Sequence, residues 1–243
     1  MTFNKYLSAV ISLVLLVAFT APTAAQTCLP TATFTHTNDE GQEITETAES
    51  YSGSAPVKAE FKANPVDADD YTARFEWIIY ETGKENNILV HRFEQDIEYT
   101  FLHSGSFTVE LKATFSAGSD ETPYPAEGEA PARFTVSVSE SRLEMPNAFS
   151  PNDDLRNDTY KVKNHQSIVE FHATIFNRWG QKLYSWDDVN GEWDGKVNGK
   201  VVNDGVYFVN VSAKGADGRV YHIRKDINVL TRFTNSDGSS STK

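Results

Sequence analysis

Cysteine, positive charge and long apolar runs are all scarce in this sequence. One cysteine among 243 residues excludes an internal disulfide framework and any zinc site built on several thiolates. Acidic residues outnumber basic ones by 34 to 22, and this argues against nucleic-acid binding, because phosphate contacts require an excess of Lys and Arg. The chain does contain 39% hydrophobic residues, with 15 Phe, 10 Tyr and 4 Trp, so it can bury real cores and wholesale disorder is excluded.

Motifs typical of common enzymes are missing as well. The sequence has no Gly-x-Ser-x-Gly elbow, no His-Glu-x-x-His pair and no phosphate-binding glycine loop. Its six histidines lack a metal-ligand spacing and are expected on the surface or in loops: His36, His91, His103, His165, His172 and His222. We therefore expect a protein that is not an enzyme and needs no cofactor.

Residues 1–25 are predicted to be a secretory signal peptide. They carry one charge, Lys5, followed by an apolar stretch from Leu7 to Ala21 that is shorter than the ~20 residues of a membrane span. Small residues end the segment where a signal peptidase cuts, so cleavage is expected before Gln26. A membrane anchor or a buried apolar helix is the less favoured alternative.

Cys28 lies just beyond the predicted cleavage point and leaves two alternatives open. Its sulfur is acylated if the protein is a lipoprotein, although Ala25, Gln26 and Thr27 form a poor lipobox. Otherwise Cys28 is a free thiol near a flexible N-terminus, or it pairs with another chain. In either case we expect the protein to leave the cytoplasm.

Charge divides the remaining chain into two parts. Residues 26–140 carry 21 acidic and seven basic side chains, whereas residues 141–243 carry 13 acidic and 14 basic ones. A change of this size at one point indicates a domain boundary. We therefore predict domains over residues 31–139 and 142–230, followed by a flexible tail over residues 231–243.

The first of these domains alternates apolar and polar residues, which is typical of half-buried antiparallel strands. The clearest runs are 57–63, 107–115 and 134–138. The run 75–80 is apolar on both faces at its end and predicts a central strand. Helical spacing is absent from this part of the sequence, so the expected fold is a β-sandwich.

Three segments of this domain resemble a PKD-type immunoglobulin-like domain. They are Ser52–Pro56, Trp77 on a middle strand, and the segment 99–111, in which a Gly turn precedes an aromatic-x-Val-x-Leu strand. The Asp-Gly turn that the family has after the Trp strand is absent. The resemblance implies a spacer or adhesive module at a cell surface. Trp77 is expected in the core between the sheets, with a sugar-stacking role as the alternative.

The second domain is also predicted to be a sandwich, which makes the fold class all-β with two consecutive immunoglobulin-like antiparallel β-sandwich domains. A turn-rich segment, 145–160, precedes a strand predicted over 169–179. Asn198-Gly199 is a strong two-residue hairpin signal. A second hairpin turn, Asp217-Gly218, is expected between strands over 205–213 and 220–230.

Four motifs in this domain resemble the gliding-motility-associated C-terminal domain, the type B sorting signal of type IX secretion. They are a first segment from Pro146 to Asp158, Asn-Arg-Trp-Gly at 177–180, Trp-Asp-Gly at 193–195 and Gly-x-Tyr at 205–207, in the order and at the spacing that the family shows. By this resemblance, the sorting motif consists of Pro146, Asn147, Phe149, Pro151, Asn152, Asp154, Asn157, Asp158, Asn177, Arg178, Trp179, Gly180, Trp193, Asp194, Gly195, Gly205 and Tyr207. The resemblance implies passage through the outer membrane with type IX secretion components as partners, and a location at the cell surface or outside the cell.

The first motif departs from the family pattern at two places, because Asp153 and Leu155 stand where the family has glycine. If the loop requires a positive φ there, Leu155 strains it. Turn capping by the Asn and Asp side chains is the favoured interpretation of this loop. The candidates for the alternative, a calcium site, are Asn152, Asp154 and Asp158.

Aromatic residues elsewhere in the domain are assigned by alternation along the strand predicted over 169–179. Arg178 and Phe176 share one face, so Trp179 on the other face is expected in the core. Arg178 is expected to stack on an aromatic ring or to reach a carboxylate, with docking to the secretion apparatus as the alternative. Trp186 and Trp193 sit beside predicted turns and are expected to pack over the end of the sandwich.

These observations favour a secreted, non-enzymatic surface protein, with an adhesive or spacer domain that the second domain exports. Two alternatives remain at this point. One is an accessory interaction subunit of the surface or secretion machinery. The other is a carbohydrate-binding sandwich that uses exposed Trp or Tyr side chains such as Trp186.

Overall fold

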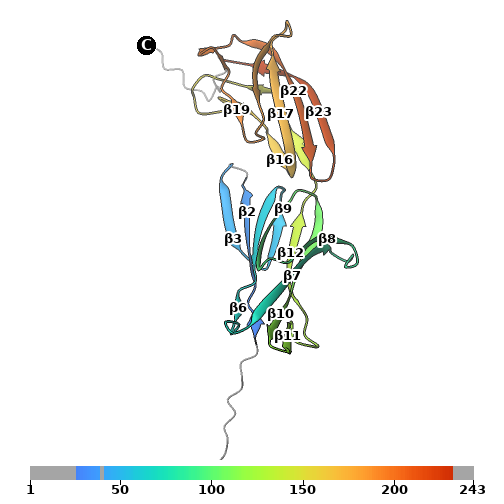
Figure 1. Cartoon of the computed structure of the whole chain (residues 1–243). Coiled ribbons are helices and arrows are strands. Elements are labelled where there is room, and N and C mark those ends of the chain that lie inside the picture. The colour runs from blue at the N-terminus through green and yellow to red at the C-terminus, as the bar shows by residue number, and fades with distance from the viewer. Residues whose placement is uncertain (1–25, 39–40, 232–243) are drawn as a thin grey trace, which may run out of the picture.

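The computed structural model describes residues 26–38 and 41–231, and all regular elements in this part of the chain are β-strands. The described residues accordingly contain no helix able to span a membrane. The predicted signal peptide, and the predicted tail beyond Thr231, lie outside them. The strands form two modules stacked end to end in an elongated molecule (Figure 1), each with its own hydrophobic core.

Two facing sheets build the N-terminal module. One has the strand order β3-β2-β5-β9 and consists of β2 (Thr31–Thr37), β3 (Glu43–Thr47), β5 (Val57–Lys62) and β9 (Asp96–Phe101). The other has the order β4-β12-β10-β7-β8 and consists of β4 (Ser50–Gly53), β7 (Thr72–Glu81), β8 (Ile88–Arg92), β10 (Gly105–Ala117) and β12 (Ala132–Val138). In addition, β11 (Asp120–Tyr124) pairs with β10, and β1 (Thr27–Cys28) pairs with β6 (Pro65–Val66).

The alternation seen in the sequence places apolar side chains between these two sheets. In β5, Val57, Ala59 and Phe61 are buried, while Lys58 and Lys62 face solvent. The runs predicted over 107–115 and 134–138 lie within β10 and β12. The period-two pattern therefore identified the core-facing side of each strand correctly.

Trp77 lies at the centre of this core. Its side chain in β7 is fully buried and lies 5.8 Å from Phe61, measured between ring centroids. The indole Nε1–H donates a hydrogen bond of 3.1 Å to the Gln95 carbonyl. Trp77 is therefore the core residue that the sequence predicted, and a ring with no exposed face is unable to stack on a sugar.

The C-terminal module has one complete sheet and an irregular second layer. The sheet has the order β14-β23-β22-β17-β18 and consists of β14 (Ala148–Phe149), β17 (Ile168–Phe176), β18 (Lys182–Trp186), β22 (Gly205–Gly215) and β23 (Val220–Val229). The second layer consists of β13 (Arg142–Glu144) with β16 (Asn164–Gln166), β15 (Tyr160–Lys161) with β19 (Glu192–Trp193), and β20 (Lys196–Val197) with β21 (Lys200–Val201). The sheet and the short pairs share one core, so the second sandwich is confirmed.

Both predicted hairpins are present in this module. Asn198 and Gly199 connect β20 to β21 with φ of 53° and 76°, and a type I′ turn requires positive φ at both of these positions. Asp217 and Gly218 lie between β22 and β23. The strand predicted over 169–179 is wrong at its end, because β17 stops at Phe176 and a turn follows.

The strand pairs are antiparallel, as expected, apart from one parallel pair in each module. In the N-terminal module β4 runs parallel to β12, and in the C-terminal module β14 runs parallel to β23. The second pairing places Phe149 in register with Val229. The first and last strands of the sheet are therefore neighbours, and they hold the motif around Phe149 against the end of the module.

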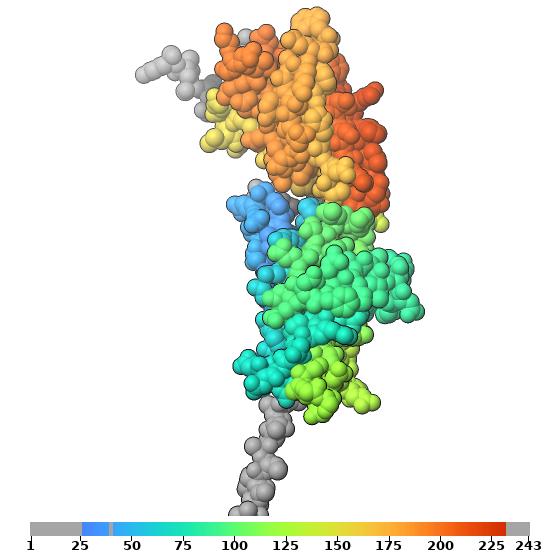
Figure 2. Space-filling model, in the orientation of Figure 1, coloured from blue at the N-terminus to red at the C-terminus, as the bar shows by residue number. Residues whose placement is uncertain are grey.

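The two modules touch through backbone groups and small side chains. The Ser104 N–H donates a hydrogen bond of 3.1 Å to the Ala216 carbonyl, and Ala216 is buried in the core of the N-terminal module. Val169 of β17 packs against the same core. The space-filling view shows the end of one module resting against the end of the other (Figure 2). The C-terminal module thus completes part of its neighbour's core.

Candidate functional site

Three of the predicted sorting motifs meet in an aromatic cluster of the C-terminal module. The ring of Phe149 lies 5.3 Å from Trp193 and 5.7 Å from Tyr160, and Tyr207 meets Trp193 edge-on at 6.1 Å. Trp193 and Tyr160 are fully buried, and burial raises the pKa of Tyr160. The Tyr160 hydroxyl donates to the Pro146 carbonyl at 3.1 Å. These motif residues are therefore structural.

The Trp-Asp-Gly motif is a turn that closes over this cluster. The Trp193 Nε1–H donates to the Lys196 carbonyl at 3.1 Å, and Asp194 Oδ1 accepts the Lys196 N–H at 2.9 Å. Gly195 has a φ of 73°, and a Cβ on it would lie 2.9 Å from the ring of Pro151. A larger residue at this position would displace Pro151, so the motif requires glycine here.

Two further residues of the first motif segment fasten it to the last strand. The Asn228 N–H donates to the Asn147 carbonyl at 2.9 Å. Ser150 Oγ donates to the Leu230 carbonyl at 2.6 Å. The motif at the beginning of the module therefore holds its end in place.

Asp158 organises the loop that follows Pro151. Its Oδ1 accepts the N–H groups of Asn152 and Asp153 at 3.1 and 2.8 Å, and its Oδ2 accepts the Leu155 N–H at 2.7 Å. Three donors on one carboxylate make a backbone nest around a negative charge. The role of Asp158 in this structure is to cap the loop.

The other two calcium candidates also accept hydrogen bonds from the protein. Asn152 Oδ1 accepts the Asp154 N–H at 3.2 Å, and Asp154 Oδ1 accepts the Arg156 N–H at 2.9 Å. Among residues 26–38 and 41–231, His, Cys, Asp and Glu side chains form no group of three able to hold a metal ion. The geometry favours turn capping over a calcium site.

Positive φ occurs at three positions of this loop, with values of 60° at Asp153, 66° at Leu155 and 53° at Asn157. The first two are the places where the sequence departs from the family's glycines. Leu155 is 95% exposed, so no packing offsets a left-handed backbone that costs a non-glycine residue about 1–2 kcal/mol. The loop keeps this backbone and carries the strain at Leu155.

The Asn-Arg-Trp-Gly motif forms the turn between β17 and β18. Asn177 Oδ1 accepts the N–H groups of Trp179 and Gln181, both at 3.0 Å, and Gly180 supplies a φ of 78°. Asn177 and Gly180 thus shape the turn from its two ends. Arg178 and Trp179, between them, are left at its tip.

Trp179 is on the surface, which corrects the prediction that it lies in the core. Its side chain is 77% exposed, because β17 ends at Phe176 and the alternation of the strand does not continue into the turn. The Arg178 Cζ lies 4.6 Å from the centroid of the Trp179 ring. This contact confirms the expected stacking of Arg178 on an aromatic ring.

Apolar side chains extend this exposed surface onto the sheet. Phe176 of β17 is paired with Phe208 of β22, and Val206 lies two residues before Phe208 on the same side. Phe208 and Val206 are 43% and 47% exposed. Together with Arg178 and Arg224 they line an open groove of about 770 Å³.

The sequence analysis did not single out this groove, although a signal for it was present. Along β22 the apolar residues Val206 and Phe208 occupy the positions that alternate with buried Val209 and Val211. Apolar residues on both faces of one strand indicate a surface that something else covers. Gly205, the first residue of the Gly-x-Tyr motif, starts this strand with a φ of 148°.

Trp186 is buried, so the sugar-binding alternative based on it is wrong. Its side chain is 7% exposed and lies 6.1 Å from the ring of Phe171. The Trp186 Nε1 atom is buried without a hydrogen-bond partner in the described part of the chain. Stacking on a sugar requires an exposed ring face, which this side chain does not offer.

Cys28 is also a core residue. It lies in β1 with a side chain 3% exposed, and burial raises the pKa of its thiol to about 11. The expectation of a thiol near a flexible terminus is wrong, because β1 is paired with β6 and places Cys28 opposite Pro65. A packed sulfur at this position favours a structural role over acylation.

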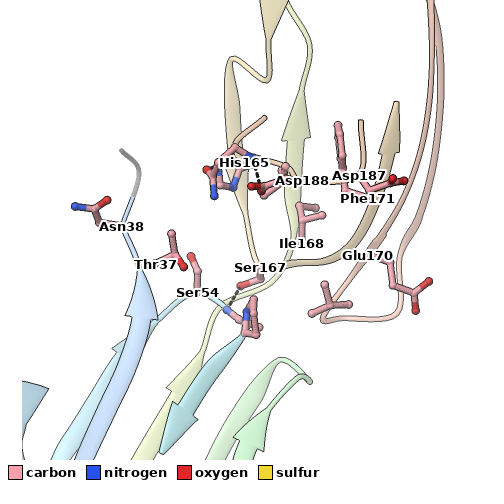
Figure 3. Close-up of a pocket in the computed structure, with 15 residues that line it drawn as sticks. Thr37, Asn38, Ser54, His165, Ser167, Ile168, Glu170, Phe171, Asp187 and Asp188 are labelled. Carbon is pink, nitrogen blue, oxygen red and sulfur yellow. Dashed lines mark hydrogen bonds between the residues drawn. The ribbon is translucent and has the colours of Figure 1, made fainter. Parts of the chain in front are cut away.

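A cavity of about 240 Å³ lies between the two modules. Figure 3 shows Thr37 and Ser54 of the N-terminal module facing His165 and Ser167 of the C-terminal module. His165 Nε2 lies 3.0 Å from the side-chain oxygen of Asn190, and Ser167 Oγ accepts a backbone N–H from the N-terminal module. Of these contacts, the bond to Ser167 crosses the junction, whereas His165 and Asn190 both belong to the C-terminal module.

Comparison with known proteins gives one family match. Residues 143–223 match the family model described as CHU_C Type IX secretion signal domain. A search of curated proteins finds no match.

Solved structures that are similar to the chain include two with low TM-scores. Dimeric latent PorU from Porphyromonas gingivalis has a TM-score of 0.25 and 13% identity, over 75% of this chain and 19% of that chain. A tetra-tandem repeat in the extending region of a large adhesion protein has a TM-score of 0.27 and 12% identity, over 83% of this chain and 67% of that chain. The chain thus spans about a fifth of the PorU chain, and TM-scores below 0.5 carry no argument about function.

The family match and the geometry concern the same residues. The match runs from Leu143 to Ile223, and it contains the aromatic cluster, the loop capped by Asp158 and the turn that presents Arg178. The C-terminal module is therefore a CHU_C type IX secretion signal domain.

Proposed function

We propose that the chain is a non-enzymatic surface protein whose N-terminal module is delivered by the C-terminal signal domain. A type IX secretion signal domain implies export to the cell surface or beyond. In this proposal residues 1–25 are a cleaved signal peptide that takes the chain across the inner membrane. Both modules then fold, and the second is read by the secretion components at the outer membrane.

The observation that carries this proposal is that the motif residues build a complete folded module. Trp193 and Phe149 lie in its core, Tyr207 packs against that core, and Asn177 shapes a motif turn that faces solvent. Such a module supplies a rigid surface for recognition, and no chemistry on the module is needed. The signal would be read by its shape and its exposed side chains.

For the N-terminal module we propose a PKD-like spacer or adhesive role. The charged and polar side chains of this module lie mostly on its outside, and its strongest aromatic candidate for a ligand, Trp77, is buried. A compact sandwich of this kind holds a surface protein away from the membrane or presents its strand edges and loops to a partner.

Deleting residues 142–243 tests the proposal. The truncated protein is expected to remain in the periplasm, while the full chain becomes accessible to protease added outside the cell. Surface exposure of the truncated form would contradict the proposal. A reporter joined to residues 1–25 and 142–243 provides the matched gain-of-function test and is expected at the surface.

Mass spectrometry of the mature protein tests the remaining parts of the proposal. The expected N-terminal residue is Gln26, with an unmodified Cys28. A chain that begins at Cys28 with an added lipid mass would contradict both statements.

A further inference from the structure

The surface around the turn between β17 and β18 combines positive charge with exposed aromatic rings. We call it the tip face and define it by Phe176, Arg178, Trp179, Val206, Phe208 and Arg224. The side chain of Trp179 is 77% exposed, and those of Val206 and Phe208 are nearly half exposed. None of the three belongs to the hydrophobic core of the module or packs against it. The tip face is thus an apolar surface that this module leaves uncovered.

The cations of the tip face are not neutralised within the described part of the chain. Arg178 and Arg224, like Lys182 beside them, form no ion pair there, whereas Lys163, Lys196 and Lys214 of the same module do. One acid, Asp226, is paired in register with Phe208 at the edge of the groove. Unpaired positive charge is notable on a chain with a net charge of −12.

The tip face is also pre-formed and accessible. Asn177 fixes the turn with two hydrogen bonds to its backbone, so the backbone that carries Arg178 and Trp179 is ordered before any partner arrives. Because β17 begins at the junction with Ile168, the turn after Phe176 lies at the end of the C-terminal module that is far from the N-terminal module (Figures 1 and 2). The delivered module leaves this end free.

We propose that the tip face docks an acidic, apolar segment of an outer-membrane protein of the secretion machinery. The inference rests on the proposed function and assigns it a surface and a partner chemistry. Trp and Arg are the residues that most often dominate binding energy in interfaces. An arginine without a carboxylate partner of its own offers a planar, two-pronged donor to a carboxylate of the partner. Phe176, Val206 and Phe208 provide the apolar floor beside it.

A second copy of this chain is the main alternative occupant. The opposite end of the molecule carries exposed acidic residues in β11 and in the loops beside β6 and β11 (Figure 1). They are Asp67, Asp69, Asp70, Asp120, Glu121, Glu127 and Glu129. Contact between this end and the tip face of another copy would be head-to-tail and would not close into a small oligomer. We favour the secretion partner because the tip face is built around a motif of the signal domain.

The test compares variants of the full chain in surface display, measured by protease accessibility on intact cells. Arg178→Glu, Arg224→Glu and Trp179→Ala are each expected to reduce display at least about tenfold, the loss that follows when one dominant contact is removed. The matched control is Arg156→Glu, which reverses an exposed charge outside the tip face and is expected to leave display unchanged. Thermal unfolding of each purified variant is expected to match the wild type, because the changed side chains are exposed.

The outcomes separate this inference from the proposed function. Normal display of all three variants, together with loss of display on deletion of residues 142–243, would overturn the tip face and leave the sorting role intact. Normal display of both Glu variants with loss in Trp179→Ala would overturn the acidic chemistry of the partner. If the purified mature chain self-associates in sedimentation and Arg178→Glu abolishes this without affecting display, the occupant is a second copy.

Discussion

The hydroxyl of Ser167 accepts a hydrogen bond of 3.1 Å from the backbone N–H of Ala55, which lies 112 residues earlier and in the other module. The same hydroxyl lies 2.9 Å from that of Ser139. Ser167 is 1% exposed, so water does not replace these contacts if they are lost. One small side chain therefore contributes directly to holding the two modules in a fixed orientation.

Ser167→Ala is expected to weaken the junction. The change leaves the buried Ala55 N–H without its acceptor, which costs about 1–3 kcal/mol. We expect one urea unfolding transition in the wild type and a separation into two transitions in the variant. The control is Ser212→Ala, which removes an exposed hydroxyl from β22. Equal single transitions in all three proteins would show that the hydroxyl does not couple the modules.

Leu155→Gly is expected to stabilise the C-terminal module. The residue has a φ of 66° and makes little use of its side chain, which is 95% exposed. Glycine removes a left-handed strain of about 1–2 kcal/mol, part of which is offset by its greater freedom in the unfolded chain. The free energy of unfolding in urea measures the gain. Leu29→Gly, at an exposed leucine without positive φ, is the control and is expected to destabilise the protein.

Asp217 is expected to make the free energy of unfolding depend on pH in the acidic range. The hydrogen bond from Ser141 Oγ, at 2.6 Å, and a second one from the Arg219 N–H lower the pKa of this carboxyl below its ordinary value of 3.8. The ionised form is thus the stabilising one, so its contribution is complete above the ordinary pKa and is lost as the pH falls through the lowered pKa.

Asp217→Asn tests this dependence. Unfolding free energies at about pH 6 and about pH 3 are expected to differ more in the wild type than in the variant. Asp69→Asn, at an exposed acid in a loop, should retain the wild-type difference. If Asp217→Asn and the wild type lose the same free energy of unfolding between these two pH values, Asp217 is not the source of the pH dependence.

Cys28 is expected to be unreactive in the folded protein. Its thiol is buried, and burial raises its pKa to about 11, so at neutral pH neither access nor the thiolate needed for reaction is available. Native protein treated with a thiol-specific reagent should show almost no modification, and protein unfolded in guanidinium should be modified completely. Rapid modification of the native chain would refute the packing of β1.

The sequence predicts the strands well because burial on one face leaves a period-two pattern that depends only on neighbouring residues. That same rule failed at Trp179, where alternation was continued past the end of β17. Asn177 and Gly180 carried the missing signal, since a side-chain acceptor followed three residues later by glycine is typical of a tight turn.

The junction was not predictable in the same way. Ser167 acts on Ala55 across 112 residues, and nothing local to either residue marks the contact. Ala216 is similar, because it belongs to one module by sequence and to the core of the other by packing. The groove beside Phe176 and Phe208 was partly predictable. Each strand has an apolar residue on its outer face, which the sequence shows, but only the sheet shows that the two residues are paired.

The parallel pairing of β14 with β23 brings the start and finish of the C-terminal module together, with the Leu230 N–H donating to the Phe149 carbonyl at 3.2 Å. Because the first and last strands of its sheet are paired with each other, the described part of the module has no free terminal strand from which unfolding could begin. We therefore expect it to remain folded after a single break near residue 140, and to fold behind an unrelated cargo. The export signal is then expected to be a detachable and portable part of the chain.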